Sequence, residues 1–587
     1  MGPETENRKP LALFMAFGTK GDVYPISAIA AAFASEQKQY RVVLVSHSAH
    51  QNLSSHLEER HVLFLGISSP PVLSVCDNYG CSGSQELAFS QQKMIATRDH
   101  RQECYSAVEG IFGHGPTMEG DFILINFFAL EGWSLAELFH VRCVVAAPYV
   151  VPYSAPSSFE SQFRREHPHL YKYLQEADSS QVSWKDVAHW MWPLYTENWG
   201  LWRSDDLYLS PFPFTVGDFG YKISIFSWNE IYDCHLLHDP VTGLPTWHDR
   251  PPSPLLLYGF SKDIVECPDY WPSNVHVCGF WFLPTEWQFS CKKCQEISEL
   301  SYPGDLRTKD EVCSAHVKLQ CFLINPASTP PIFIGLSSIG SMGFLRNPQA
   351  FLQVIQTVLE ITNFRFILFT AGYEPLDEAV QVIASESSHL DKRQYLEEGI
   401  CLFDSRLFCF PNMIPYKWLF PRCAAAIHHG GSGSTAAALH AGIPQSSLLV
   451  CSLFTLTLPN REKKHDKAGQ IFFCASAMII FTDLSPFVSL DQLIRVLCPF
   501  ILDQFYWAEK MYWIGVAPEP LNRSHLIPDK LDDVSIGMAA KVLSRAINDA
   551  LSPNIKARAL EIAERISLED GVMEAVKILK QEMNCSC

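Results

Sequence analysis

The sequence predicts an α/β protein made of two doubly wound, Rossmann-like domains, and three observations support this prediction. Its 587 residues exceed the roughly 250–300 residues at which a single hydrophobic core stops growing. Short apolar runs alternate with helical patterns, which is the order typical of a parallel sheet. This alternation stops in the middle of the chain and then begins again. We therefore expect one domain over residues 1–328 and a second over residues 329–587.

In the first domain, the apolar run at residues 11–17 is predicted to be the first strand. It ends in the turn Gly-Thr-Lys-Gly-Asp and leads into a helix with Pro25 in its first turn. Residues 156–202, rich in Trp, Tyr and His, are predicted to be helical. The domain is expected to end in a charged, cysteine-containing linker at about residues 285–328. Further strands are predicted at residues 41–46, 61–67, 122–128, 142–148 and 255–261.

In the second domain the pattern restarts with an apolar strand at residues 330–338 and a helix at residues 347–361. The end of the domain, residues 532–583, is predicted to be helical because apolar residues recur at three- and four-residue spacing. Two such domains imply a cleft between them, and ligands of open α/β sheets bind beyond the carboxyl ends of the strands. Further strands are predicted at residues 364–372, 399–404 and 423–429.

The composition excludes some functions. A formal net charge of −18 argues against a broad nucleic-acid surface, because binding phosphates requires clustered Lys and Arg. The 19 cysteines are scattered, and free thiols are expected. Cys291 and Cys294 form a C-x2-C pair, but Cys313 and Cys321 are too far apart in sequence to form a second tight pair. We therefore expect no metal ion.

The stretch His-His-Gly-Gly-Ser-Gly-Ser, residues 428–434, lies between a predicted strand and an alanine-rich helix. Glycines allow a close approach of the backbone to a ligand, and the free N–H groups and dipole of a helix N-terminus attract anions. His429, Ser432 and Ser434 add side-chain donors. The stretch is suited to a diphosphate, although a tight turn that binds nothing has the same pattern.

Two carboxylates also lie at predicted helix starts. Asp22, in the first turn, is either an N-cap or a base that takes a proton from a ligand hydroxyl. Asp503 and Gln504 begin an aromatic helix, where they either cap the helix or bind the vicinal hydroxyls of a sugar. His47, after the second strand, is a weaker candidate for a base, and a histidine in a turn is the alternative.

The order and spacing of four motifs resemble the UDP-glucose:sterol 3β-glucosyltransferases, especially the plant type. These motifs are FGTKGDVYPISAIAAAF, VHVCGFWFLP, HHGGSGSTAAALHAGIPQ and PFILDQFYWAEKMYWIGVAPEPL. The resemblance covers about residues 11–580. It implies the GT-B fold, with an acceptor-binding first domain and a second domain that binds UDP-glucose. It also implies inverting transfer of glucose to the 3β-hydroxyl of a sterol, with no metal required.

The resemblance assigns roles to individual residues. Asp22 matches the catalytic base, in a turn where Lys20 stands in place of the usual Arg. Asp503 and Gln504 match the pair that binds glucose. The other positions that match donor-binding residues are Thr19 and Lys20 in the first turn, Ser338, Asn412 and Ile414 near the nucleotide, and His429, Ser432, Gly433 and Ser434 at the diphosphate.

Two segments, at about residues 216–238 and 446–496, interrupt motifs that are otherwise continuous. We hypothesise that both are late insertions or translated intron sequence. Because a sterol acceptor resides in a membrane, the resemblance implies peripheral contact at the cytosolic face of a membrane. The most apolar run of the chain, residues 471–481, is too short to span a bilayer. The alternatives are a UDP-sugar transferase for another lipid or a small aglycone, and an inactive or mis-spliced product disrupted by the 446–496 insert.

Overall fold

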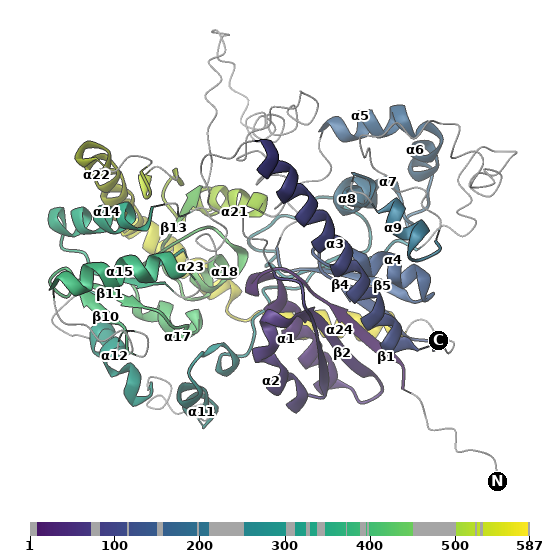
Figure 1. Ribbon diagram of the computed structural model, residues 1–587, viewed down its shortest axis with the longest axis horizontal. Helices are drawn as coiled ribbons and strands as arrows, with labels where there is room; N and C mark the ends of the chain where they lie inside the picture. Colours follow the sequence, from purple (N-terminus) through teal and green to yellow (C-terminus); the bar gives the residue numbers. More distant parts are fainter. Residues whose placement is uncertain are drawn as a thin grey trace, which may run out of the picture.

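The structure is a computed structural model of the whole chain. It describes residues 9–584 apart from 72–82, 114–116, 150–156, 197–198, 210–251, 301–311, 325–328, 337–344, 346, 371–372, 388–394, 396–397, 450–500, 523–524 and 529–531. The two predicted domains lie side by side in Figure 1, the first on the right and the second on the left. The segment at 216–238 and most of 446–496 lie outside the described residues.

The first domain is built on a seven-stranded sheet in the order β3-β2-β1-β4-β5-β6-β7, with every pair parallel. This confirms the predicted doubly wound architecture. The strand order reverses between β1 and β4, so the turn after β1 lies at the switch point where ligands of such sheets bind. The strands are β1 (Leu11–Met15), β2 (Arg41–His47), β3 (Val62–Ile67), β4 (Phe122–Ile125), β5 (Arg142–Ala147), β6 (Leu255–Tyr258) and β7 (Val275–Val277).

The second domain has its own seven-stranded sheet, in the order β10-β11-β9-β8-β12-β13-β14. All described pairs are parallel except β10 with β11. Here the order reverses between β8 and β12, which places the His-His-Gly-Gly turn after β12 at the second switch point. The strands are β8 (Ile332–Gly335), β9 (Phe366–Phe369), β10 (Ile400–Leu402), β11 (Leu407–Phe410), β12 (Ala425–His428), β13 (Gln445–Leu449) and β14 (Leu521–Asn522).

Helices connect the strands in both domains, and the predicted helical stretches at 156–202 and 347–361 are confirmed. The first domain contains α1 (Lys20–Glu36), α2 (Ser54–Glu59), α3 (Gly83–Phe112), α4 (Glu131–Leu138), α5 (Ser157–Glu166), α6 (Pro168–Gln175), α7 (Trp184–Asp186), α8 (Trp192–Thr196) and α9 (Gly200–Asp205). Later helices are α11 (Lys292–Leu300), α12 (Val317–Ile324), α14 (Pro348–Ile361), α15 (Glu374–Ser387), α17 (Tyr416–Leu419), α18 (Ser432–His440), α21 (Ile501–Trp513), α22 (Asp533–Ala550), α23 (Pro553–Ile566) and α24 (Gly571–Asn584).

The predicted start of the first helix is wrong. Helix α1 begins at Lys20, so Pro25 lies inside the helix rather than in its first turn. The reason is a capping box, in which the Thr19 side chain and the Asp22 side chain satisfy each other's backbone N–H groups. Because this box fixes the start of the helix before the proline, Pro25 costs α1 the hydrogen bond that its missing N–H would have donated.

The last helix, α24, corrects the predicted domain boundary. Residues 532–583 are helical as expected, but α24 packs against α1 of the first domain (Figure 1). Val576 and Leu579 share a hydrophobic core with Ile29. Arg142 on β5 also forms an ion pair with Glu582, with 2.9 Å between Nη2 and Oε2. The C-terminus therefore returns to the first domain.

The stretch predicted to be a linker, about residues 285–328, is instead folded where it is described. Helices α11 and α12 flank a gap in the described residues and pack on the second sheet. Leu319 and Phe322 of α12 are buried in one core with Phe333 of β8 and Ile367 of β9. Apolar side chains on this charged stretch account for the packing.

The predicted boundary of the segment at 446–496 also changes. Residues 445–449 form strand β13, which pairs with β12 through Ala426–Gln445 and the next two residue pairs. Strand β12, helix α18 and strand β13 complete a β-α-β unit without any later residue. The extra segment therefore begins after Leu449, and residues 450–500 lie outside the described residues.

Aromatic contacts join the two domains. Phe280, after β7, lies 6.4 Å from Trp507 of α21 between ring centroids, and Phe282 lies 4.8 Å from His440 of α18. These contacts hold α18 and α21 of the second domain against the first. The two switch-point turns are consequently brought to the same region of the molecule.

Candidate active site at the domain interface

The turn after β1 holds Asp22 in a fixed position. Both the backbone N–H and the hydroxyl of Thr19 donate to Asp22 Oδ2 at 2.7 Å. Gly18 has φ +102°, and a Cβ atom there would lie 2.7 Å from Asp22 Oδ2. The Nε2–H of His50 donates to the carbonyl of Gly18 at 3.0 Å. Thr19 is therefore the N-cap and Asp22 is its capping-box partner, which leaves Asp22 Oδ1 for other contacts.

Burial makes the carboxylate of Asp22 more basic than that of an ordinary aspartate. Its side chain is only 8% exposed. Burial raises the pKa of Asp22 to about 7, although the two hydrogen bonds from Thr19 favour the charged form and oppose this shift. A carboxylate with a pKa near neutrality is a better base than an ordinary aspartate and is still substantially ionised at neutral pH.

In the second turn, His428 supports the backbone. The Gly430 N–H donates to His428 Nδ1 at 3.1 Å, so the ring proton lies on Nε2 and is donated to Gln445 Oε1 at 2.9 Å. Burial lowers the pKa of His428 to about 3, which keeps this tautomer neutral. The first histidine of the pair is thus structural, and it fixes the shape of the turn for the second.

His429 and the start of α18 form the part of the turn that is suited to an anion. Burial lowers the pKa of His429 to about 4, partly opposed by a backbone interaction with Gly335, so this ring is neutral at pH 7. Helix α18 begins after the extended N-cap Gly431. The backbone N–H groups in the first turn of a helix lack intrahelical acceptors and are suited to binding an anion. Ser432, Gly433 and Ser434 all lie in this first turn.

The pair Asp503 and Gln504 lies in the first turn of α21, directly beside this anion site. A Cβ atom on Gly430 would lie 2.9 Å from the carbonyl oxygen of Gln504, so only glycine allows this approach. Asp503 is 6% exposed. Burial raises the pKa of Asp503 well above its usual range, and the charge of Asp22 raises it further. The charge of Asp22 therefore acts on Asp503 although the two carboxyl groups belong to different domains, so both face the interface between the domains.

Tyr149 is a residue of this site that the sequence analysis missed. Burial raises the pKa of Tyr149, and the charges of Asp22 and Asp503 raise it further, so the phenol lies near both carboxyl groups. It follows the carboxyl end of β5. Its position could have indicated a site residue, because β5 was predicted correctly and ligands bind beyond the carboxyl ends of such strands.

Lys20 makes a second connection between the domains. Its Nζ lies 2.8 Å from Sδ of Met413, which stands between Asn412 and Ile414 in the loop after β11. The side chain of Ile414 is buried in the core of the second domain, so this residue can reach a ligand only through its backbone. The loop that carries Asn412 and Ile414, here called the nucleotide loop, therefore lies against the Gly-Thr-Lys-Gly-Asp turn.

One predicted site residue, His47, is not brought to this cluster, and Ser338 lies outside the described residues. His47 Nδ1 is hydrogen-bonded to Ser69 Oγ at 3.2 Å, and its pKa is lowered to about 3 by burial and by the neighbouring His100 and His50. His50, not His47, contacts the turn that carries Asp22. The structure thus favours a buried histidine after a strand over a second base at position 47.

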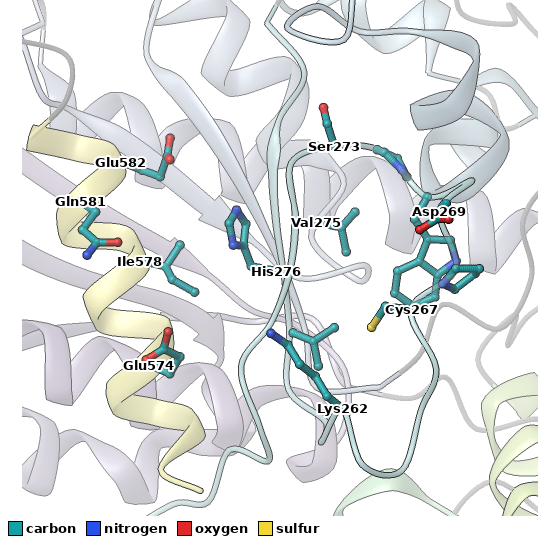
Figure 2. A pocket seen from close by; sticks show the side chains of 14 residues that line it. Lys262, Cys267, Asp269, Ser273, Val275, His276, Glu574, Ile578, Gln581 and Glu582 are labelled. Carbon is teal, nitrogen blue, oxygen red and sulfur yellow. The ribbon is translucent and has the colours of Figure 1, made fainter.

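A separate cavity of about 500 Å³ lies on the outer flank of the first domain. It is formed between α24, with Glu574 and Glu582, and the segment around β7, with Lys262 and His276 (Figure 2). None of the predicted site residues lines it. This cavity therefore does not belong to the cluster around Asp22 and Asp503.

Comparison with known proteins shows which proteins have sequences similar to this chain. Over 567 residues the chain is 23% identical to sterol 3-beta-glucosyltransferase UGT80B1 of Arabidopsis thaliana. The aligned region covers 96% of this chain and 66% of that protein. The chain is thus similar over most of its length to proteins named sterol 3-beta-glucosyltransferase. It is also 22% identical over 586 residues to the Arabidopsis sterol 3-beta-glucosyltransferase UGT80A2, covering 98% of this chain and 66% of that protein. The chain thus spans slightly less than two thirds of the length of these relatives.

A family model matches part of the second domain. The model described as Erythromycin biosynthesis protein CIII-like, C-terminal domain, matches residues 389–453. The match includes the His-His-Gly-Gly turn and α18 but neither Asp22 nor Asp503. Among solved structures, CalG4, the calicheamicin glycosyltransferase, is 13% identical, with a TM-score of 0.47 and coverage of 98% of this chain and 99% of that one.

Proposed function

We propose that this chain transfers glucose from UDP-glucose to the 3β-hydroxyl of a membrane sterol, with inversion at the anomeric carbon. The observation that carries the proposal is the proximity of Asp22 from one domain to Asp503 from the other, next to a helix N-terminus suited to a diphosphate. The similarity to proteins named sterol 3-beta-glucosyltransferase over nearly the whole chain supports the sterol as acceptor.

In the proposed reaction, Asp22 accepts the proton of the sterol hydroxyl while the hydroxyl oxygen attacks C1 of glucose. A bond forms between this oxygen and C1, and the bond between C1 and the diphosphate oxygen breaks. The attack comes from the face opposite UDP, which inverts the configuration. Because Thr19 occupies Oδ2 of Asp22, the other carboxyl oxygen is the one that receives the proton.

The second domain stabilises the UDP that leaves. Negative charge accumulates on the diphosphate, where the N–H groups of Ser432, Gly433 and Ser434 and the dipole of α18 stabilise it. Neutral His429 adds a hydrogen-bond donor. These groups supply stabilisation that a metal ion provides in other transferases, and the proposal includes no metal at the diphosphate. Asn412 and the backbone of Ile414 are assigned to the uracil.

The surroundings of Asp22 and Asp503 favour different roles for the two carboxyl groups. Burial and the charge of Asp22 both raise the pKa of Asp503, which favours its protonated form, whereas two hydrogen bonds from Thr19 favour the charged form of Asp22. Asp22 is then available as the base. A protonated Asp503 can both donate and accept hydrogen bonds, and together with Gln504 it suits the hydroxyl groups of glucose.

A sterol acceptor implies contact with a membrane. Among the described helices, none combines the length and the apolar character needed to cross a bilayer. We propose peripheral contact at the cytosolic face.

The direct test is to incubate the purified full chain with UDP-[14C]glucose and a panel of sterols in detergent micelles. Labelled steryl glucoside is the expected product, and binding of UDP is measured in parallel by calorimetry. UDP binding with transfer only to another lipid or a small aglycone would replace the sterol as acceptor. Absence of both UDP binding and transfer would mean an inactive protein.

We expect kcat/KM for the sterol to rise with pH and to level off above about pH 7. The reason is that the base must be ionised, and the pKa of Asp22 in the free protein is about 7. A pH series at saturating UDP-glucose checks this. A profile that is flat between pH 5 and pH 9, or that falls as pH rises, would contradict the role of Asp22.

Replacing Asp503 with Ala should weaken use of the sugar without weakening binding of UDP. Loss of its hydrogen bonds to glucose should lower kcat/KM for UDP-glucose by roughly 10- to 100-fold. Kinetics with UDP-glucose and calorimetry with UDP separate the two effects. Tyr512→Ala, a change at an exposed position on the same helix, is the matched control. Equal losses in both variants would show that the effect comes from the helix and not from the carboxyl group.

A further inference from the structure

A group of metal-binding side chains lies outside the proposed active site, where α11 and α12 pack on the second domain. The ligand atoms of Cys291, Cys294, Cys313 and His316 all lie within 4.8 Å of one another. Among the described residues, this is the group of three or more His, Cys, Asp or Glu side chains that can hold a metal ion. The predicted absence of a metal was based on the wrong partner for Cys313.

The distances within the cluster fit a tetrahedral zinc ion. The sulfurs of Cys291 and Cys313 are 3.7 Å apart, and Cys313 Sγ is 3.6 Å from His316 Nδ1. Cys294 Sγ lies 3.1 Å from the same nitrogen. With Zn–S bonds of about 2.3 Å, tetrahedral geometry separates two sulfurs by about 3.8 Å. The measured separations are therefore close to those of a site that binds zinc.

The sequence order of the ligands is also that of a zinc site. Cys291 and Cys294 form a first tight pair at the start of α11, and Cys313 and His316 form a second pair at a 3-10 turn, Ser314–His316. Cys321, considered above as the partner of Cys313, is exposed on α12. The C-x2-H spacing supplies the second pair that was thought to be missing.

The surroundings favour a structural metal ion over free thiols. Cys294, Cys313 and His316 are 2%, 4% and 3% exposed and lie in the apolar core that includes Phe410, whose ring is 5.2 Å from that of His316. The backbone N–H of Cys313 donates to the sulfur of Cys294 at 3.4 Å, an interaction that stabilises a thiolate ligand. Three sulfurs and one imidazole select zinc over magnesium or calcium, which prefer oxygen.

We propose that Cys291, Cys294, Cys313 and His316 bind a structural zinc ion that fastens the α11–α12 segment to the second domain. Four protein ligands close the coordination sphere, so the ion has no open position for catalysis. Zinc binding releases the thiol protons and ties two stretches on either side of residues 301–311 to one point. The segment that joins the two domains is thereby held on the second sheet.

The residue next to the zinc site is hydrogen-bonded to the nucleotide loop. The consequence drawn from this contact rests on the proposed function. Ser290 precedes the first ligand, Cys291, and its backbone N–H donates to the carbonyl of Met413 at 3.3 Å. The Met413 N–H in turn donates to Ser290 Oγ at 3.1 Å. Met413 lies between Asn412 and Ile414, so loss of the metal should loosen the loop that is assigned to the uracil.

The test is the metal content of the full chain, purified without chelators and measured by plasma mass spectrometry. About one zinc ion per chain is expected, falling several-fold in Cys294→Ser and unchanged in the control Cys321→Ser. Cobalt added to the chelated protein should give the intense visible absorption of a tetrahedral thiolate site. Chelation should lower the Tm, and added zinc should restore it.

Other results of these experiments would contradict the zinc site. Wild-type chain that contains no zinc and does not take up cobalt would overturn the proposal, as would a disulfide between Cys291 and Cys313 found by mass spectrometry. Full zinc content in Cys294→Ser would also overturn it. If that variant does not fold, Cys291→Ser, at the rim of the cluster, and the cobalt titration of the wild type decide. Metal content is independent of activity, so an inactive chain with zinc would contradict only the proposed function.

Discussion

The Asp22→Asn variant should form steryl glucoside roughly 100- to 10,000-fold more slowly than the unchanged chain, which is the range that a general base contributes. Asparagine still accepts a hydrogen bond from Thr19 but does not take a proton from the sterol. The residues assigned to UDP all lie in the second domain apart from Thr19 and Lys20. Turnover is measured with UDP-[14C]glucose, and UDP affinity, expected to be unchanged, is measured by calorimetry.

The stability of this variant separates catalysis from folding. The folded-state pKa of Asp22, about 7, is above the ordinary value of 3.8, so the folded chain holds this proton more tightly than the unfolded chain. The resulting stabilisation is present at low pH and is lost as pH rises from about 4 to about 7. At pH 8 the Asp22→Asn variant, which buries no charge, should therefore melt at the same temperature as the unchanged chain or higher.

Asp186→Asn provides a matched control for Asp22→Asn. Asp186 is also buried and forms the same kind of capping box, in this case with Ser183 at the start of α7. It makes no described contact with Asp22 or Asp503. The control should keep its turnover. Full turnover in Asp22→Asn would show that another group is the base, and equal losses in both variants would reduce Asp22 to a helix cap.

Much of the fold followed from the sequence because apolar strands and helical patterns are local signals. Residues 11–17 and 41–46 were recognised as buried strands from their own composition, and both form neighbouring strands in the sheet. The start of α1 was predicted wrongly because Pro25 favours a first-turn position. The capping box of Thr19 and Asp22 has the larger effect and starts the helix earlier. Local patterns therefore predict that a helix or strand exists, but they do not show which of two possible residues begins a helix.

What the sequence did not give depends on contacts between distant residues. Helix α24 is amphipathic wherever it packs, so its pattern did not show that it returns to α1, more than 500 positions earlier. His316 is brought to Cys294 by the folding of α11 and α12, and a list of cysteines alone could not include it. The phenol of Tyr149 is exposed to the charge of Asp503 only because the second domain packs against the first.

The Gly430→Ala variant should lose both stability and affinity for UDP-glucose. Gly430 has φ +83°, a conformation that costs a residue with a side chain about 1–2 kcal/mol. The added Cβ would also lie 2.9 Å from the carbonyl oxygen of Gln504, which is backbone and has little room to yield. Helix α21 must then move away, taking Asp503 and Gln504 from the glucose, so affinity for UDP-glucose should fall about tenfold or more.

Gly537→Ala is the matched control, because a Cβ at this position on α22 meets no atom within 4 Å. Within a helix this change should raise stability by up to about 1 kcal/mol and leave the binding of UDP-glucose unchanged. Calorimetry with UDP-glucose and thermal unfolding of both variants make the comparison. If Gly430→Ala binds UDP-glucose as tightly as Gly537→Ala, the turn after β12 tolerates movement of α21, and the contact between Gly430 and Gln504 does not position the donor. If affinity for UDP-glucose falls while affinity for UDP changes little, the contact between Gly430 and Gln504 positions the sugar and not the nucleotide.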